Sequence, residues 1–272
     1  MELKATRYTV DGPVATVWLH RPHRHNAWTG RMHTEYRWVL AQLAKDAGVR
    51  VVVVTGTPPA FCVGADSTAL AGHVERGGYD DGLPAELATP GYGVRPEFDH
   101  DFSFHFGLPY VLVAAVNGAA AGVGLAVALF CDLRFASATA KLTTAAPRLG
   151  LPAEYGMSWM LPRLIGVTRA NDLLLSGRVV TGADTADWGL WNGVLPDGEA
   201  TVAEAARYSS EVAATVGPSA LRTTKRQIYD DLLSNDVGTA LVEARRLLVE
   251  AMGTAEYREG VAAFQERRPT KF

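Results

Sequence analysis

The chain has little cysteine, no excess of charge and no clustered histidines. Its 272 residues include two cysteines, Cys62 and Cys131, and both lie among apolar neighbours. This usage matches no metal-ligand spacing and is typical of small buried residues in a reducing compartment. The seven histidines form no His-x-x-x-His pair and no cluster with cysteine. We therefore expect no metal site.

The charge balance and the apolar runs exclude further classes of protein. A formal net charge of −3 gives no basic field that would attract nucleic acid or acidic lipid. The first residues lack the charged-then-apolar profile of a signal peptide. The most apolar stretch, residues 112–131, is interrupted by Asn117 and by several glycines. It indicates a buried strand, a turn and a helix rather than a membrane span. We expect a cytoplasmic protein with neither a nucleic-acid nor a membrane partner.

Strand and helix patterns alternate along the first part of the chain. Residues 14–19, 49–55 and 111–116 are expected to be strands, and the last two are as apolar as strands buried on both faces. Helices are expected from Thr29 to Gly48, from about residue 122 to Cys131, and after Gly156 as far as Gly166. This order predicts an α/β architecture. Residues 77–106 show no pattern, and a loop of that length is usually functional.

After residue 199 the pattern becomes helical. Residues 203–216, 219–233, 237–252 and 255–267 read as helices with few strand signals. A helical tail with this much apolar surface needs a cover, so we expect contacts between subunits. The sequence thus predicts a core over residues 1–199 and a helical oligomerisation region over residues 200–272.

Two segments resemble the signatures of the crotonase (enoyl-CoA hydratase/isomerase) superfamily. The first is Ala60-Phe61-Cys62-Val63-Gly64-Ala65-Asp66, and the second runs over residues 114–124 and ends in Cys131-Asp132. Residues 161–166 and 259–269 match the family in the same order. The resemblance implies an α/β fold of the ClpP/crotonase type, a spiral of repeated ββα units with a C-terminal helical trimerisation region. The expected assembly is a homotrimer or a dimer of trimers.

The resemblance also implies the chemistry. The substrate is an acyl-CoA thioester, with coenzyme A as part of the substrate and no separate cofactor. The reaction passes through an enolate, whose oxygen is stabilised by two backbone N–H groups. By resemblance these donors belong to Ala65 and Val123, and the small residues beside them let the backbone approach the ligand. Here Val123 replaces the middle glycine of the family motif, which keeps the N–H but crowds the site.

One departure from the family concerns the acid and base residues. Typical hydratases use two glutamates, and the matched segments place Ala126 and Ala146 at those positions. Alanine cannot transfer a proton, so the usual hydration apparatus is missing. Glu154 instead matches the acid of family members that resemble 3-enoyl-CoA to 2-enoyl-CoA isomerases. We expect Glu154 to be the proton shuttle and Asp66 to be the second candidate, unless Glu154 only starts a helix.

Other residues are expected to bind the acyl-CoA. By resemblance the ligand lies across residues 60–66. Arg24 and the basic tail that includes Lys271 are expected to meet its phosphates. Aromatic residues within 77–106 are expected to border the acyl group. The expected ligand contacts outside catalysis are Arg24, Ala60, Phe61, Cys62, Gly64, Asp66, Gly122 and Lys271.

Three functions fit these residues. The first is an isomerase-like acyl-CoA enzyme of fatty-acid or related metabolism. The second is an enoyl-CoA hydratase in which Glu154 serves unusually for water. The third is a weakly catalytic acyl-CoA-binding protein that kept the two N–H donors but lost its acids. Turnover of 2-enoyl-, 3-enoyl- and aroyl-CoA thioesters separates them.

Overall fold

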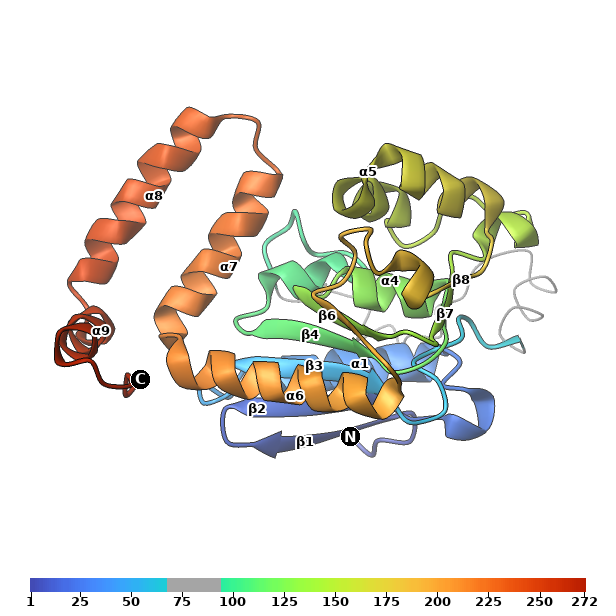
Figure 1. The fold of residues 1–272 in the computed structure, drawn as a ribbon, viewed down its shortest axis with the longest axis horizontal. Coiled ribbons are helices and arrows are strands. Elements are labelled where there is room, and N and C mark those ends of the chain that lie inside the picture. The colour runs from blue at the N-terminus through green and yellow to red at the C-terminus, as the bar shows by residue number, and fades with distance from the viewer. Residues whose placement is uncertain (68–93) are drawn as a thin grey trace.

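A mostly parallel sheet forms the centre of the protein (Figure 1). The computed structural model describes residues 1–67 and 94–272. Within these ranges the main sheet has six strands in the order β1-β2-β3-β4-β6-β9. Only β1 and β2 run antiparallel; the other neighbours are parallel. The strands are β1 (Thr6–Asp11), β2 (Val14–Leu19), β3 (Val51–Gly56), β4 (Val111–Val116), β6 (Leu133–Ser137) and β9 (Gly193–Leu195).

A second, smaller sheet lies beside the first. It consists of β5 (Ala120–Ala121), β7 (Lys141–Thr143) and β8 (Val180–Thr181). Strand β5 directly follows the turn after β4, so the small sheet begins where the central strand of the main sheet ends. The chain therefore enters α4 (Val123–Leu129) from a segment that is held by strand pairing.

Helices cover both faces of the main sheet. On one face α6 (Gly198–Thr215) packs its Ala205 and Ala213 against alternate residues of β3 and β4, such as Val53 and Val113. On the other face the intervening residues join the core of α1 (Gly30–Leu43), α4 and α5 (Met157–Ser176). Strands with both faces buried are apolar at nearly every position, and β3 and β4 follow this pattern, with Thr55 as the one polar residue.

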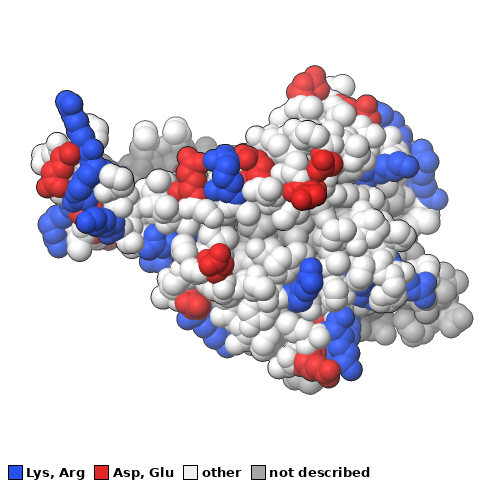
Figure 2. Space-filling model, turned by 60° about the horizontal axis from the view of Figure 1, so that its bottom comes forward, with Lys and Arg blue, Asp and Glu red and all other residues white. Residues whose placement is uncertain are grey.

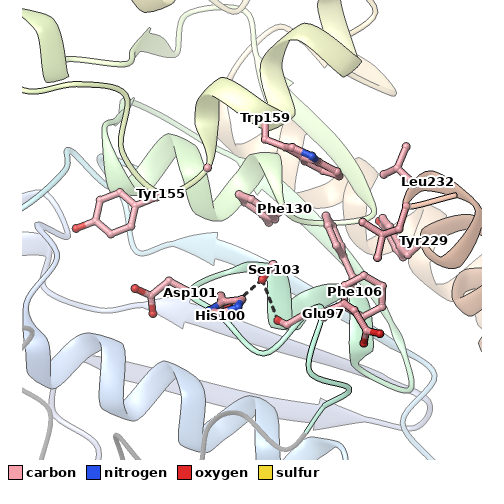
Figure 3. Close-up of a pocket in the computed structure, with 13 residues that line it drawn as sticks. Glu97, His100, Asp101, Ser103, Phe106, Phe130, Tyr155, Trp159, Tyr229 and Leu232 are labelled. Atoms are coloured by element: carbon pink, nitrogen blue, oxygen red, sulfur yellow. Dashed lines mark hydrogen bonds between the residues drawn. The ribbon is translucent and has the colours of Figure 1, made fainter. Parts of the chain in front are cut away.

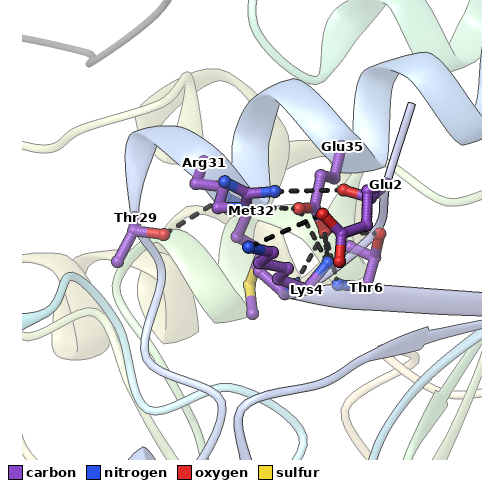
Figure 4. A network of polar contacts seen from close by, with 8 residues as sticks. Glu2, Lys4, Thr6, Thr29, Arg31, Met32 and Glu35 are labelled. Atoms are coloured by element: carbon purple, nitrogen blue, oxygen red, sulfur yellow. Dashed lines mark hydrogen bonds and ion pairs between the residues drawn. The ribbon is translucent and has the colours of Figure 1, made fainter.

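A buried carboxylate joins α1 to the first strand (Figure 4). Glu35 is 1% exposed and accepts backbone N–H groups from Lys4, Ala5 and Thr6 at 2.7 to 3.1 Å. Arg31 also donates to it, at 2.7 Å. Burial alone would raise the pKa of Glu35, but these hydrogen bonds outweigh it and hold the pKa below its usual value. The charge therefore stabilises the docking of α1.

The last three helices extend away from the sheet, on the left of Figure 1. They are α7 (Pro218–Leu232), α8 (Val237–Met252) and α9 (Ala255–Glu266). The buried ammonium of Lys225 fixes α7 to the core, because it donates to the carbonyls of His105 and Tyr110 at 2.8 Å and pairs with Asp132 at 2.9 Å. By contrast, α8 and α9 expose large apolar side chains such as Leu241 and Phe264.

Three of the sequence-based expectations can be compared with the helices of the structure. Helix α6, which begins at the predicted boundary near residue 199, packs on the sheet, and the division into a core and an oligomerisation region stays a prediction. At Gly166 the backbone leaves the helical conformation (φ 73°, ψ 161°), so the helix that starts after Gly156 ends there as expected, and a second helical segment continues to Ser176. Of the loop predicted over 77–106, residues 77–93 lie outside the described residues, and the rest includes the short helix η2 (Ser103–Gly107).

The surface carries charges of both signs. On the face drawn in Figure 2, Lys and Arg side chains alternate with Asp and Glu, and no single sign covers it. None of the helices in residues 1–67 and 94–272 is long and apolar enough to cross a membrane.

Candidate active site

The two signature segments meet at the carboxyl ends of β3 and β4. These strands are parallel neighbours, so the loops that follow them leave the same edge of the sheet. The Cys62 N–H donates to the Ala119 carbonyl and the Cys62 carbonyl accepts from the Ala121 N–H, both at 3.0 Å. Asn117 reinforces the junction by donating to the Gly56 carbonyl at 2.8 Å. The two segments thus form one unit.

Glycine is required where these segments touch. A Cβ atom on Gly124 would lie 2.2 Å from the Cys62 carbonyl oxygen, and one on Gly118 would lie 2.6 Å from the Pro59 carbonyl oxygen. Both distances are far below van der Waals contact with rigid backbone. The two glycines therefore let the start of α4 approach the loop after β3.

Asn26 holds the first loop from a third segment. Its side-chain nitrogen donates to the carbonyls of Thr57 and Ala60, both at 2.7 Å, and its side-chain oxygen accepts the Arg21 N–H at 2.9 Å. Asn26 is completely buried and has a φ of 58°, a conformation that asparagine tolerates better than most residues. The loop is therefore fixed before any ligand arrives.

Within residues 1–67 and 94–272, the N–H groups of Ala65 and Val123 have no hydrogen-bond acceptor. Trp28 donates to the Gly64 carbonyl at 2.8 Å and accepts from the Asp66 N–H at 2.9 Å, so the Ala65 N–H points to the other side of the segment. Val123 is the first residue of α4, where an N–H has no partner within the helix. Neither N–H donates a hydrogen bond within the described chain. Each is available to a ligand oxygen.

The other residues of the first loop are mostly buried. Ala60, Phe61 and Cys62 are at most 2% exposed, so their side chains pack in the core and can offer a ligand only their backbone. Burial raises the pKa of the Cys62 thiol to about 12, which keeps it protonated at neutral pH. Asp66 is 4% exposed and forms an ion pair of 2.9 Å with Arg21. This pairing stabilises the carboxylate and disfavours Asp66 as a base.

Glu154 lies in the turn that leads into α5. Its carbonyl accepts the Met157 N–H at 3.0 Å, and its side chain is half-buried. Burial raises the pKa of Glu154 above its usual value. The residues at the two hydratase positions, Ala126 and Ala146, are at most 1% exposed. Of these three positions, only the one occupied by Glu154 has a titratable side chain.

A row of aromatic rings connects Tyr155, the residue after Glu154, with the first loop. Trp28, which pairs with the backbone around Ala65, contacts the ring of Phe102 at 5.6 Å between centroids. Phe102 in turn contacts Tyr155, also at 5.6 Å. Tyr155 directly follows Glu154 in the chain. The turn that contains Glu154 and the first loop therefore belong to one packed region.

A cavity of about 500 Å³ opens beside Tyr155 and Gly156 (Figure 3). We call it the aromatic cavity. It is lined by Glu97, Phe98, His100, Asp101, Ser103, Phe106, Phe130, Tyr155, Gly156, Trp159, Tyr229, Leu232 and Leu233. Phe98, one of the aromatic residues within 77–106 that were expected to border the acyl group, lines this cavity; the rings contributed by α5 and α7 were not anticipated. No local sequence signal marks them.

The two predicted phosphate contacts are not brought together within one chain. Arg24 is exposed on η1 (Pro22–Arg24) and adjoins the first loop, because the Val63 N–H donates to the His25 carbonyl at 3.3 Å. Lys271 is next to the C-terminal residue, whose carbonyl accepts from Arg50 at 2.9 Å. Arg50 precedes β3, whereas the first loop follows it. Lys271 therefore lies at the opposite end of this strand. No group of three or more metal-binding side chains occurs among the described residues.

Comparison with known proteins identifies the class. A solved structure of a probable enoyl-CoA hydratase/isomerase from Mycobacterium abscessus superposes with a TM-score of 0.85 at 29% identity and covers 98% of each chain. A probable enoyl-CoA hydratase from Rhodobacter capsulatus is 32% identical and covers 100% of this chain and 99% of that protein. The 1,2-epoxyphenylacetyl-CoA isomerase of Escherichia coli is 32% identical, covering 97% and 96%. The fold is that of the crotonase class, as the sequence predicted.

The particular family follows from a further match. The family model described as enoyl-CoA hydratase/isomerase matches residues 9–272. The chain belongs to the enoyl-CoA hydratase/isomerase family, whose members are acyl-CoA enzymes.

Proposed function

We propose that the protein moves the double bond of an acyl-CoA thioester by proton transfer through Glu154. The Glu154 carboxylate takes the α-proton of a 3-enoyl thioester, and the electrons move onto the thioester oxygen. The N–H groups of Ala65 and Val123 stabilise that enolate. The protonated Glu154 then returns the proton at the γ-carbon, which gives the 2-enoyl product and regenerates the base.

The distribution of carboxyl groups carries this proposal. Hydration needs groups that activate a water and protonate a carbon, and Ala126 and Ala146 supply neither. Isomerisation needs only one carboxylate, because the same proton leaves and returns. The raised pKa of Glu154 supports the role, since a carboxyl group with a pKa closer to neutrality accepts a proton more readily.

The unused N–H groups supply the second half of the mechanism. Both are backbone donors on segments fixed by Asn26 and by close glycine contacts, so they need little reorganisation when charge develops. One such donor is typically worth about 3–4 kcal/mol in the transition state. The positive end of α4 adds to the donor of Val123.

A Glu154→Gln variant tests the proposal. Amide and acid have nearly the same shape, so acyl-CoA affinity should stay close to that of the wild type, while turnover of a 3-enoyl-CoA should fall at least about 100-fold. The matched control is Glu199→Gln, which changes an exposed glutamate in the first turn of α6. Near-normal turnover by Glu154→Gln would refute proton transfer by Glu154, which would then be only a residue that precedes a helix.

The pH profile adds an independent readout. The base must be ionised, and burial raises the pKa of Glu154, so the rate should fall as pH falls through this raised pKa. The loss should therefore begin at a higher pH than the ordinary carboxyl value of 4.5 predicts. The inflection should disappear from the residual activity of Glu154→Gln.

Hydration is a second candidate because several relatives carry hydratase names. In that case Glu154 would activate a water that adds to a 2-enoyl-CoA. Measuring absorbance loss of the conjugated 2-enoyl thioester separates the two reactions. Hydration without isomerisation would replace the first proposal. Binding of acyl-CoA without turnover of either substrate would refute both reactions and favour the third function, an acyl-CoA-binding protein.

The remaining parts of the proposal concern the ligand and the assembly. We propose that Arg24, which is exposed beside the first loop, meets a phosphate of coenzyme A and that no cofactor beyond the substrate takes part. The exposed apolar faces of α8 and α9 support a homotrimer or a dimer of trimers, since water would otherwise cover side chains such as Leu241 and Phe264. Lys271 could then meet a ligand only in another subunit.

A further inference from the structure

The aromatic cavity has a wall of stacked rings that come from distant parts of the chain. Phe106 of η2 stacks on Tyr229 of α7 at 3.9 Å between centroids and 14° between planes. Phe106 also contacts Phe130, which ends α4, at 5.4 Å and Trp159 of α5 at 6.4 Å. Figure 3 shows these rings together along one side of the cavity.

The ring wall is held in place by buried polar contacts. The Tyr229 hydroxyl donates to Asp132 at 2.7 Å, and the same carboxylate pairs with the buried Lys225 at 2.9 Å. Arg163 lies over the ring of Trp159, 4.0 Å from its centroid. Because these side chains are already held in place, little conformational entropy is lost when a ligand binds, and little of the contact energy is spent on ordering them.

The opposite side of the cavity is polar and acidic. Glu97, His100, Asp101 and Ser103 line it. Glu97 forms an ion pair of 2.9 Å with Arg95, which does not line the cavity, and Asp101 lies 3.6 Å from the Nε2 atom of His33. These two carboxylates disfavour a negatively charged group in the cavity but accept hydrogen bonds from a neutral polar one.

The cavity joins the proposed reaction centre through the turn before α5. Tyr155 and Gly156 line it, and they are the two residues that follow Glu154. An acyl group with its α-carbon at Glu154 therefore has this cavity beside it. A volume of about 500 Å³ is within the range of sites that enclose a drug-sized ligand and exceeds the need of a short alkyl chain.

We propose that the aromatic cavity binds an uncharged aromatic acyl group and that Trp159 and Tyr229 select for it. The inference rests on the proposed function, because it places the acyl part of the thioester beside Glu154. Flat rings gain from edge and offset contacts with an aromatic wall, whereas an alicyclic ring of the same carbon skeleton gains only from burial.

Binding of two matched thioesters tests the inference. Phenylacetyl-CoA and cyclohexylacetyl-CoA have the same carbon skeleton and differ in the aromaticity of the ring. Titration calorimetry on the wild type should give an affinity on the order of tenfold higher for the phenyl compound, since one or two aromatic contacts differ. para-Carboxyphenylacetyl-CoA, which brings a negative charge to the acidic side, should bind more weakly than phenylacetyl-CoA.

Two substitutions locate the preference. Trp159→Leu should bring the ratio of the two affinities close to one, and Trp159→Phe, which retains a ring, should keep most of it. The control is Trp188→Leu. Trp188 is also half-buried with an arginine over its ring, at 5.3 Å, but does not line the cavity. Equal affinities for the two thioesters in the wild type, or a ratio that Trp159→Leu leaves unchanged, would overturn the inference.

Failure of this inference and failure of the proposed function remain distinguishable. The binding ratio requires no turnover and can be repeated in Glu154→Gln. A normal ratio together with an active Glu154→Gln would refute the base while the aromatic preference stands. A ratio of one together with an inactive Glu154→Gln would refute the aromatic preference alone.

Discussion

Replacing Asn26 by aspartate should show how the first loop, which follows β3, is held. Asn26→Asp keeps the shape of the side chain and its tolerance of a φ of 58°. It replaces an amide that donates to the Thr57 and Ala60 carbonyls by a group with at most one proton. As a carboxylate, the new group would face two carbonyl oxygens in a site without solvent exposure. It should therefore be protonated in the folded protein.

The cost can be worked out from two contributions. A neutral carboxyl group serves one carbonyl and leaves the other without its donor, which costs about 1–3 kcal/mol. Keeping an ordinary aspartic acid, with a pKa of about 3.9, protonated at pH 7 costs about 4 kcal/mol, at about 1.4 kcal/mol for each pH unit. The free energy of unfolding should therefore fall by roughly 5–7 kcal/mol at pH 7.

The sign of the pH dependence follows from the direction of the shift. The pKa of the new carboxyl group is raised in the folded state, so its penalty grows as pH rises above the unfolded value of about 3.9 and levels off above the folded value. At pH 5 the protonation cost is only about 1.5 kcal/mol. The destabilisation should thus be about 2.7 kcal/mol smaller at pH 5 than at pH 7.

Urea unfolding followed by tryptophan fluorescence measures this difference against the wild type at each pH. The control is Asn26→Ala, which loses the same hydrogen bonds and adds no titratable group. Its destabilisation should be the same at both pH values. If Asn26→Asp costs less than about 1 kcal/mol at pH 7, or costs the same at both, the amide does not hold the loop in the way described.

Two further predictions concern the N–H donor and the assembly. Val123→Pro removes the N–H at the first position of α4, where proline fits a helix, so kcat/KM should fall by about 10²–10³-fold with little change in the unfolding midpoint. Val123→Ala keeps the N–H and should retain activity. If Val123→Pro and Val123→Ala had the same kcat/KM, this would contradict the role of the Val123 N–H. Light scattering at micromolar concentration should give a trimer or hexamer, and Leu241→Asp, on the exposed face of α8, should lower the mass. A monomeric wild type would contradict the assembly.

The central strands and the meeting of the two loops were predictable from sequence. The valine-rich run before residue 56 and the apolar run over 111–116 became β3 and β4 almost as expected, because their pattern is local and continuous. Gly118 and Gly124 mark where backbone approaches backbone, and the structure places both against the loop after β3. The residues that carry the family resemblance thus include strands with a continuous local pattern and glycines required by a close backbone contact.

Other parts of the site had no local signal. Strands β5 and β8 have two residues each, and partners brought from other segments determine whether such short pieces pair. Phe130, Trp159 and Tyr229 read as ordinary helix residues with apolar neighbours. They line one cavity only because α4, α5 and α7 converge there. Sequence periodicity identifies the buried face of a helix but not which other helix it will meet.

The position of α7 changes how the C-terminal region should be understood. Lys225 and Tyr229 are four residues apart, so they lie on one face of the helix, and both contact Asp132. Lys225 fixes the helix to the core, and Tyr229 carries the ring that stacks on Phe106 in the aromatic cavity. A region predicted to serve assembly therefore also forms a wall of the cavity. Any shift of α7 would move that ring and alter the shape of the aromatic cavity.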